Sequence, residues 1–192
     1  MSNYFNDYFQ LIEDGIRSVD HTKLISISET IKKVNENDGT IFIVGNGGSA
    51  AVASHASVDF TKAAKIRATT FNESSLLTCF SNDYGYENWV EKALGFYAKK
   101  NDMLILISSS GQSKNILNAA RKAKEMKLPL VTFSGFSSEN RLKELGDVNL
   151  WIDSSKYNIV ENVHQIWILY HTLLLQLTVH LCSSDLLLRI TL

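Results

Sequence analysis

Four serines and a glycine gather in one short segment of the chain. This serine loop has the sequence Ser108-Ser109-Ser110-Gly111-Gln112-Ser113. A phosphate monoester needs many hydrogen-bond donors in a small cup, and hydroxyls together with the free amides of a helix start supply them without a fixed cation. One serine before a helix is ordinary capping, whereas four in six residues exceed what a cap needs. The segment therefore predicts a phosphate-binding loop.

A second segment is rich in glycine. This glycine loop and the residues after it have the sequence Gly45-Asn46-Gly47-Gly48-Ser49-Ala50-Ala51. Glycines allow a tight turn and a close approach of a ligand to the backbone. The amides and dipole of a helix that begins near Ser49 would point at a bound anion, and the Ser49 hydroxyl adds a donor.

Nucleotide binding by the glycine loop is disfavoured. The spacing Gly45-x-Gly47-x-x-Ala50 fits a relaxed dinucleotide fingerprint, but residues 65–70 offer no acidic group for a ribose. The chain also lacks the Gly-Lys-Ser/Thr of a nucleotide P-loop. An ordinary glycine turn remains the alternative to phosphate binding. We therefore expect no nucleotide cofactor.

The elements that must position these loops alternate between strand and helix. Apolar, β-branched runs predict strands at 40–44, 76–80, 103–107, 130–133 and 148–152. Helical periodicity predicts helices at 49–65, 87–99, 112–127, 137–145 and 158 to about 179, after a helical segment at 4–36 in which a break near 18–22 is left open. This alternation predicts an α/β fold, a doubly wound parallel five-stranded sheet with helices on both faces. Ligands of such folds bind beyond the carboxyl ends of the strands, where both loops lie.

Composition excludes several classes of protein. The chain has 192 residues, a net charge of -1 and no long run of Lys or Arg, so no nucleic-acid partner is expected. Cys79 and Cys182 lie far apart and suit a reducing cytoplasm. The apolar stretch 163–182 contains several polar side chains, which favours a buried or oligomer-facing helix over a membrane span. We expect one cytoplasmic domain over 1–192, with a helical segment at 1–38 and an α/β core at 39–192.

Several motifs together carry a family resemblance. They are the glycine loop followed by His55, the stretch Asn82-Asp83-Tyr84-Gly85-Tyr86, and the serine loop continued by Lys114-Asn115. To about residue 177 the chain resembles the SIS (sugar isomerase) family, in its sedoheptulose 7-phosphate isomerase (phosphoheptose isomerase) branch. The tail 183–192 does not match this pattern.

The resemblance implies a flavodoxin-like SIS domain in a homotetramer with sites built between subunits. The implied reaction interconverts a ketose and an aldose heptose phosphate, on the route to nucleotide-activated heptose for lipopolysaccharide or capsule. Implied phosphate contacts are Ser49, Ser108, Ser110 and Ser113, with Gly47 and Ser109 in the same two loops. Asn46 and Asp83 would contact the sugar.

Isomerisation requires a base for a C–H proton, an acid for the oxygen and a group that holds the oxyanion. The family's base is a glutamate, and this chain has Asp59 there, one turn after His55. The family pattern also implies zinc on His55, Asp59 and Glu161. Where a family histidine stands on the terminal helix, this chain has Leu169, which can be neither acid nor ligand.

Candidate partners for the base are Glu161, where the family has glutamine, and His164, one turn away. His164 could equally be a satisfied core histidine, and Asp59 a solvated residue. His171 lies two positions past Leu169 and points about 200° away, so it does not substitute. The replacements at 59 and 169 leave open an alternative function, a non-catalytic SIS protein that binds a sugar phosphate or assists protein assembly.

Overall fold

The computed structural model describes the backbone of residues 2–182 and the side chains of residues 3–176. Five parallel strands form one sheet in the order β2-β1-β3-β4-β5. The strands are β1 Ile41–Gly45, β2 Ala68–Thr69, β3 Met103–Ser108, β4 Leu130–Ser134 and β5 Val148–Trp151. This is the flavodoxin-like order, so the predicted fold class is confirmed.

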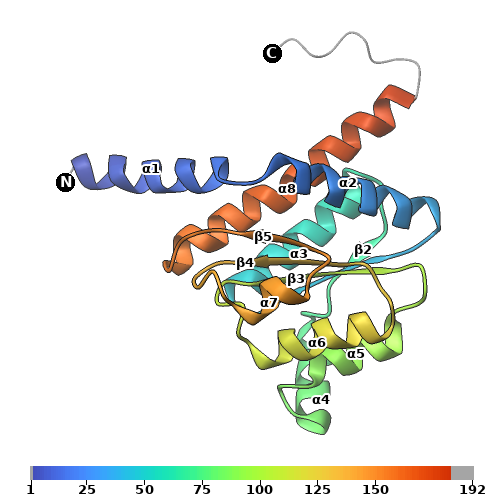
Figure 1. Ribbon diagram of the computed structural model, residues 1–192. Coiled ribbons are helices and arrows are strands. Elements are labelled where there is room, and N and C mark those ends of the chain that lie inside the picture. Colours follow the sequence, from blue (N-terminus) through green and yellow to red (C-terminus); the bar gives the residue numbers. More distant parts are fainter. Residues whose placement is uncertain (1, 183–192) are drawn as a thin grey trace.

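Helices cover both faces of the sheet (Figure 1). They are α1 Ser2–Arg17, α2 His21–Glu36, α3 Gly48–Lys62, α4 Ser74–Tyr84, α5 Trp89–Tyr97, α6 Lys114–Glu125, α7 Arg141–Leu145 and α8 Tyr157–Cys182. One apolar core joins α2, α3 and α8 to the sheet, and a second joins α5, α6 and α7 to its other face. The strands β1, β3 and β4 are buried throughout because both faces are covered.

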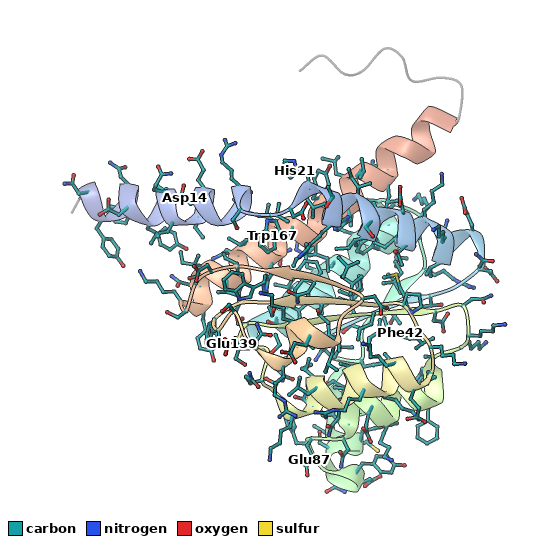
Figure 2. All side chains as sticks on the ribbon, viewed as in Figure 1. Asp14, His21, Phe42, Glu87, Glu139 and Trp167 are labelled. Carbon is teal, nitrogen blue, oxygen red and sulfur yellow. The ribbon has the colours of Figure 1, made fainter. Side chains whose placement is uncertain are left out.

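The N-terminal helical segment is broken where the sequence left a break open. Asp20 accepts a hydrogen bond from Thr22 N at 2.9 Å and caps α2. Trp167 of α8 donates its Nε1–H to the carbonyl of Ile16 at 3.1 Å and so ties α8 to α1 (Figure 2). The outer part of α1 extends beyond the rest of the described molecule (Figure 1).

The predicted strand at 76–80 is wrong. Glu73 accepts from the amides of Ser75 and Leu76, both at 3.0 Å, and this cap starts helix α4. The second strand is instead the short β2, which pairs with Ile41 and Phe42 at the edge of the sheet. A short apolar run is compatible with a strand or with a helix, and here the side-chain cap at Glu73 starts a helix.

The terminal helix α8 runs along the α3 side of the sheet. Within residues 2–182, no helix is long and apolar enough to cross a membrane. The tail 183–192, which the sequence left without an account, lies outside the described residues.

Candidate functional site

Strand register places the two predicted loops side by side. Gly45 of β1 is paired with Ile107 of β3, so Asn46 and Ser108 leave the sheet at the same level. On the other side of β3, Ser108 is paired with Ser134 at the end of β4. The glycine and serine loops are therefore neighbours at the carboxyl edge, as their positions after two strands predict.

The glycine loop adopts a backbone conformation that explains its composition. Gly47 precedes α3 with φ of 56° and ψ of -124°, a backbone conformation that residues with a side chain rarely adopt. The position where a Cβ would stand on Gly47 is open space. Ser49 is 2% exposed and packs so close to Gly45 that a Cβ on Gly45 would collide with Ser49. The sequence did not single out Asn72, whose side chain accepts from Gly45 N at 3.2 Å and donates to Gly45 O at 2.8 Å.

The serine loop leaves hydroxyls free of internal bonds. Gly111 turns the chain with φ of +62°, and its amide donates to Ser108 O at 3.0 Å. Ser110 Oγ accepts from Gln112 N at 3.2 Å, whereas Ser113 precedes α6 without a capping bond. Ser109 Oγ is buried with no hydrogen-bond partner among the described residues. The loop can therefore direct hydroxyls and helix-start amides at an anion.

A buried amide supports the serine loop from beneath. Asn140 is fully buried, and its Nδ2 donates to Ser137 O at 2.8 Å while its Oδ1 accepts from Lys143 N at 3.0 Å. A Cβ at Gly111 would collide with this amide. Gly135 N donates to Ser109 O at 3.0 Å and ties the loop to the end of β4. The hydrogen-bond partners of Asn140 are near it in sequence, but its contact with Gly111 exists only in the folded chain, so the sequence pattern does not mark it.

The predicted sugar contacts differ in their surroundings. Asn46 is half-buried and is held by the side chains of Asn115 and Tyr86. Asp83 lies exposed on α4, where its Oδ1 accepts from Asn82 Nδ2 at 2.9 Å. No contact recorded among the described residues joins Asp83 to either loop, so its role stays a prediction.

His55 and Asp59 lie together on α3. His55 Nε2 is 3.5 Å from Asp59 Oδ2, and His55 Nδ1 is 2.7 Å from Nε2 of Gln165 on α8. All three are at least partly exposed. The sequence did not predict the contact with Gln165, which depends on how α8 packs against α3.

Asp59 is far from the phosphate loops of its own chain. It lies ten residues beyond Ser49 on the same helix. At the helical rise per residue, this separation is about 15 Å along the axis. Asp59 therefore lies well along α3 from the loops that are predicted to hold the phosphate.

Glu161 of α8, by contrast, packs against the first residue of α3. Its carboxylate fills the space beside Gly48, where a Cβ would collide with it. Burial raises the pKa of Glu161 above its ordinary value. Among residues 3–176, no three His, Cys, Asp or Glu side chains form a group that could hold a metal ion. The chain brings together His55 and Asp59 of the predicted zinc ligands, and zinc stays a prediction.

His164 lies in the core and not at the surface. It is 0% exposed, and its Nε2 is 3.1 Å from the carbonyl oxygen of Ser134. Burial lowers the pKa of His164 to about 4. In this position it cannot touch a substrate, and the alternative of a core histidine fits the structure. His171 is also buried, with Nδ1 2.7 Å from Ser28 Oγ.

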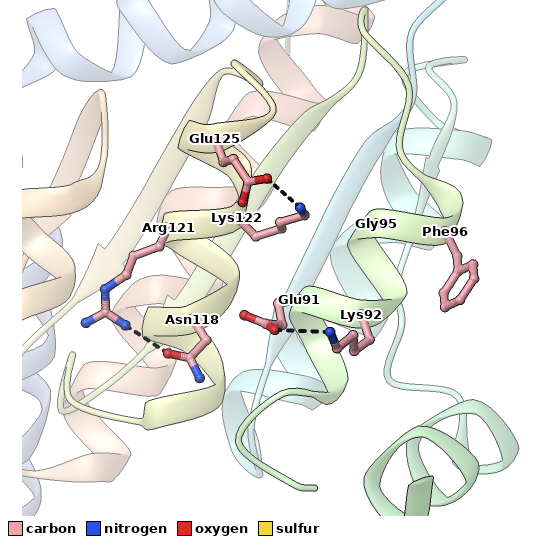
Figure 3. A pocket seen from close by; sticks show the side chains of 8 residues that line it. All are labelled: Glu91, Lys92, Gly95, Phe96, Asn118, Arg121, Lys122 and Glu125. Carbon is pink, nitrogen blue, oxygen red and sulfur yellow. Dashed lines mark hydrogen bonds and ion pairs between the residues drawn. The ribbon is translucent and has the colours of Figure 1, made fainter. Parts of the chain in front are cut away.

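A surface pocket of about 390 Å³ lies away from these loops, between α5 and α6 (Figure 3). Its walls carry alternating charges, with Lys122 bound to Glu125 at 2.9 Å and Lys92 3.8 Å from Glu91. None of the predicted site residues lines it.

Comparison with known proteins shows the family of the chain. A model of the SIS domain matches residues 3–135. A phosphoheptose isomerase of Helicobacter pylori (strain Shi470) is 32% identical over 165 residues, which cover 83% of this chain and 85% of that protein. The chain belongs to the phosphoheptose isomerase family of SIS-domain proteins. Phosphoheptose isomerase 1 of Campylobacter jejuni, another member of the family, is 34% identical over 173 residues, 80% of this chain and 90% of that protein.

The fold of the family is also that of solved structures. A phosphoheptose isomerase from Neisseria gonorrhoeae superimposes with a TM-score of 0.82 at 24% identity, covering 91% of this chain and 96% of that one. One from Francisella tularensis gives the same TM-score at 20% identity. These likenesses confirm the SIS fold of the chain.

Proposed function

We propose that the chain is an isomerase that interconverts sedoheptulose 7-phosphate and an aldose heptose 7-phosphate through an enediol. The observation that carries the proposal is the pair of loops side by side at one edge of the sheet, both with hydroxyls and each followed by a helix start. Membership of the phosphoheptose isomerase family supports it. The product would feed the synthesis of nucleotide-activated heptose for surface polysaccharide.

The reaction moves one proton between adjacent carbons. A base removes a proton from C1 of the ketose, the C1–C2 double bond forms, and the C2 oxygen takes the electron pair and then a proton. The C1 oxygen then loses its proton, C2 gains one, and the aldehyde results. No oxidant and no second substrate are needed.

Residues of the two loops and of α3 and α8 fill these roles. The serine loop and Ser49 hold the phosphate, and Asn46 contacts the sugar. Glu161 beside Gly48 serves the oxygen, because a carboxyl group with a raised pKa is a better proton donor near neutral pH. Asp59 is the base that takes the carbon-bound proton.

We place Asp59 in a site shared with a second copy of the chain. About 15 Å of helix separate it from the phosphate loops of its own chain. Large apolar side chains exposed on α1 and α8 offer surface for association, among them Tyr4 at 72%, Phe9 at 64% and Leu173 at 57%. A homotetramer whose sites take the loops from one subunit and Asp59 from another meets both observations.

No step of this proposal passes through zinc. Within one chain, the described residues offer the metal only His55 and Asp59 as neighbouring ligands. Assays with and without added zinc test whether a neighbouring subunit completes a ligand set.

A non-catalytic, sugar-phosphate-binding function is the second candidate, because this chain lacks two residues of the family pattern. With Asp59 in place of glutamate and Leu169 in place of histidine, the same loops could bind a sugar phosphate in a regulatory or assembly protein without turnover. A hydroxyl-lined loop has no purpose in a protein that binds no phosphate, so this alternative also predicts sugar-phosphate binding.

Incubation with sedoheptulose 7-phosphate, followed by NMR, separates the two. Turnover that Asp59→Asn abolishes, with sugar-phosphate binding retained, supports the isomerase. Binding without turnover in the unaltered protein supports the alternative. A protein that shows no binding and no turnover would refute both proposed functions.

A further inference from the structure

Two asparagines from different segments form a reciprocal amide pair beside the loops. Asn46 Nδ2 donates to Asn115 Oδ1 at 3.0 Å, and Asn115 Nδ2 donates to Asn46 Oδ1 at 2.9 Å. The hydroxyl of Tyr86 donates to the same Asn46 Oδ1 at 3.2 Å. Asn115, in the first turn of α6, is 2% exposed, whereas Asn46 is half-buried.

These bonds decide which polar group Asn46 can still offer to a ligand. A side-chain amide has two N–H donors and an oxygen with two lone pairs. Asn115 and Tyr86 occupy both lone pairs of Asn46 Oδ1, and Asn115 takes one of the two N–H groups. One N–H of Asn46 remains, so the side chain faces the site as a donor with no acceptor to spare.

We propose that this N–H is an oxyanion donor: Asn46 binds the sugar carbonyl oxygen, which becomes negatively charged in the enediolate. Asn115 and Tyr86 are positioning residues that fix the amide in the donor orientation. The inference rests on the proposed function and assigns a step to Asn46 within it. No bond is made or broken at Asn46, which only strengthens its hydrogen bond as charge develops.

The chemistry of sugar oxygens favours the carbonyl. A sugar hydroxyl donates as well as accepts, so a site that reads hydroxyls gains by offering both kinds of group. Carbonyl and phosphate oxygens only accept, and the serine loop already surrounds the phosphate with donors. Asn46 leaves the sheet level with Ser108 and lies two residues before Gly48, beside which the carboxylate of Glu161 is placed.

Asn46→Asp is the sharpest variant. It keeps the shape of the side chain and lets Asn115 and Tyr86 still donate to Oδ1. It removes both N–H groups, the free one and the one that bonds Asn115 Oδ1, and adds a negative charge. Removing one oxyanion donor typically lowers kcat about 100- to 1,000-fold, and we expect a loss at least of that size. Asn35→Asp makes the same change on an exposed part of α2 and serves as the matched control.

The positioning residues have a separate readout. Tyr86→Phe removes one bond to Asn46 and keeps the aromatic ring, so we expect kcat to fall about 10-fold with KM changed less than 3-fold. Asn115→Leu should lower kcat further, because it removes two of the three hydrogen bonds that hold the Asn46 amide. A fall in melting temperature without this split between kcat and KM would mean that Asn115 and Tyr86 only support the fold.

Two inhibitors separate this inference from the proposed function. A phosphorylated hydroxamate imitates the enediolate, whereas a phosphorylated sugar alcohol has no carbonyl oxygen. By calorimetry, Asn46→Asp should lose at least 30-fold in affinity for the hydroxamate and less than 3-fold for the sugar alcohol. Equal losses for both, or a rise in KM with kcat unchanged, would overturn the oxyanion role.

These binding measurements do not need turnover. If the unaltered protein fails to isomerise the sugar but prefers the hydroxamate through Asn46, the substrate assignment fails and the donor role stands. If Asn46→Asp does not fold, Tyr86→Phe decides the question by the same two affinities.

Discussion

The claim that the site needs two subunits can be tested by mixing two inactive variants. Asp59→Asn removes the base and keeps both phosphate loops. The double variant Ser108→Ala/Ser113→Ala keeps Asp59 and removes two hydroxyls from the serine loop. Hydrogen bonds to a charged group contribute roughly 1.5–3 kcal/mol each, so the double variant should bind the phosphate about 100-fold or more weakly.

The restored fraction follows from the geometry. Asp59 is about 15 Å of helix away from the loops of its own chain, and in the proposed oligomer each site combines a loop from one subunit with an Asp59 from another. In a random one-to-one mixture, half of the loops and half of the bases are intact, and about a quarter of the sites of a symmetric oligomer hold both. Mixed oligomers should therefore regain about a quarter of the unaltered activity.

The two variants would be co-expressed with different tags and purified on both. Isomerase activity would be measured below KM, and native mass spectrometry would verify that subunits are mixed. Activity no greater than the sum of the separate variants, in oligomers shown to be mixed, would refute the distance argument and place a base within each chain.

Three further predictions concern particular residues. Burial lowers the pKa values of His164 and His171 to about 4, below the ordinary value of 6.5, so the unfolded chain binds protons first as the pH falls from 6.5. The free energy of unfolding, measured with urea, should drop by about 2 kcal/mol per histidine between pH 7.5 and 5, and an unchanged value would contradict their burial. Glu161→Gln should raise the melting temperature above pH 5 and lose this advantage as the pH falls towards 4, because the raised pKa of Glu161 means that the folded state favours the neutral form. Gly111→Ala should lower stability by at least about 1–2 kcal/mol for its positive φ alone and weaken the thermal shift by sugar phosphate. Gly95→Ala on α5, where the added Cβ would meet only Lys122 Cε at an ordinary contact distance of 3.8 Å, should leave stability equal or higher.

The framework of the fold can be predicted because its signals are local. Buried parallel strands such as Met103–Ser108 are continuous apolar runs, and glycine and serine clusters mark where they end. The two-residue strand Ala68–Thr69 is too short to give a pattern of its own, and Glu73 turns an apolar run into a helix through a side-chain cap.

The sequence predicts the two loops of the candidate site but not the contacts that tertiary packing makes around them. The serines are next to one another in sequence, so their common purpose is visible there. Asn72 and Asn115 act through partners that only the folded chain brings near. His164 could be a core or a site residue, depending on which side of α8 it occupied, and the structure places it in the core.

The central claim is that this chain moves a carbon-bound proton of a heptose phosphate, and NMR in deuterium oxide tests it most directly. The unaltered protein, incubated with sedoheptulose 7-phosphate, should form an aldose 7-phosphate that carries deuterium at C2, because the base exchanges its proton with solvent. The Asp59→Asn variant should form no aldose and should incorporate no deuterium. Sedoheptulose 7-phosphate recovered with no aldose and no deuterium, from a protein that binds it, would contradict the account.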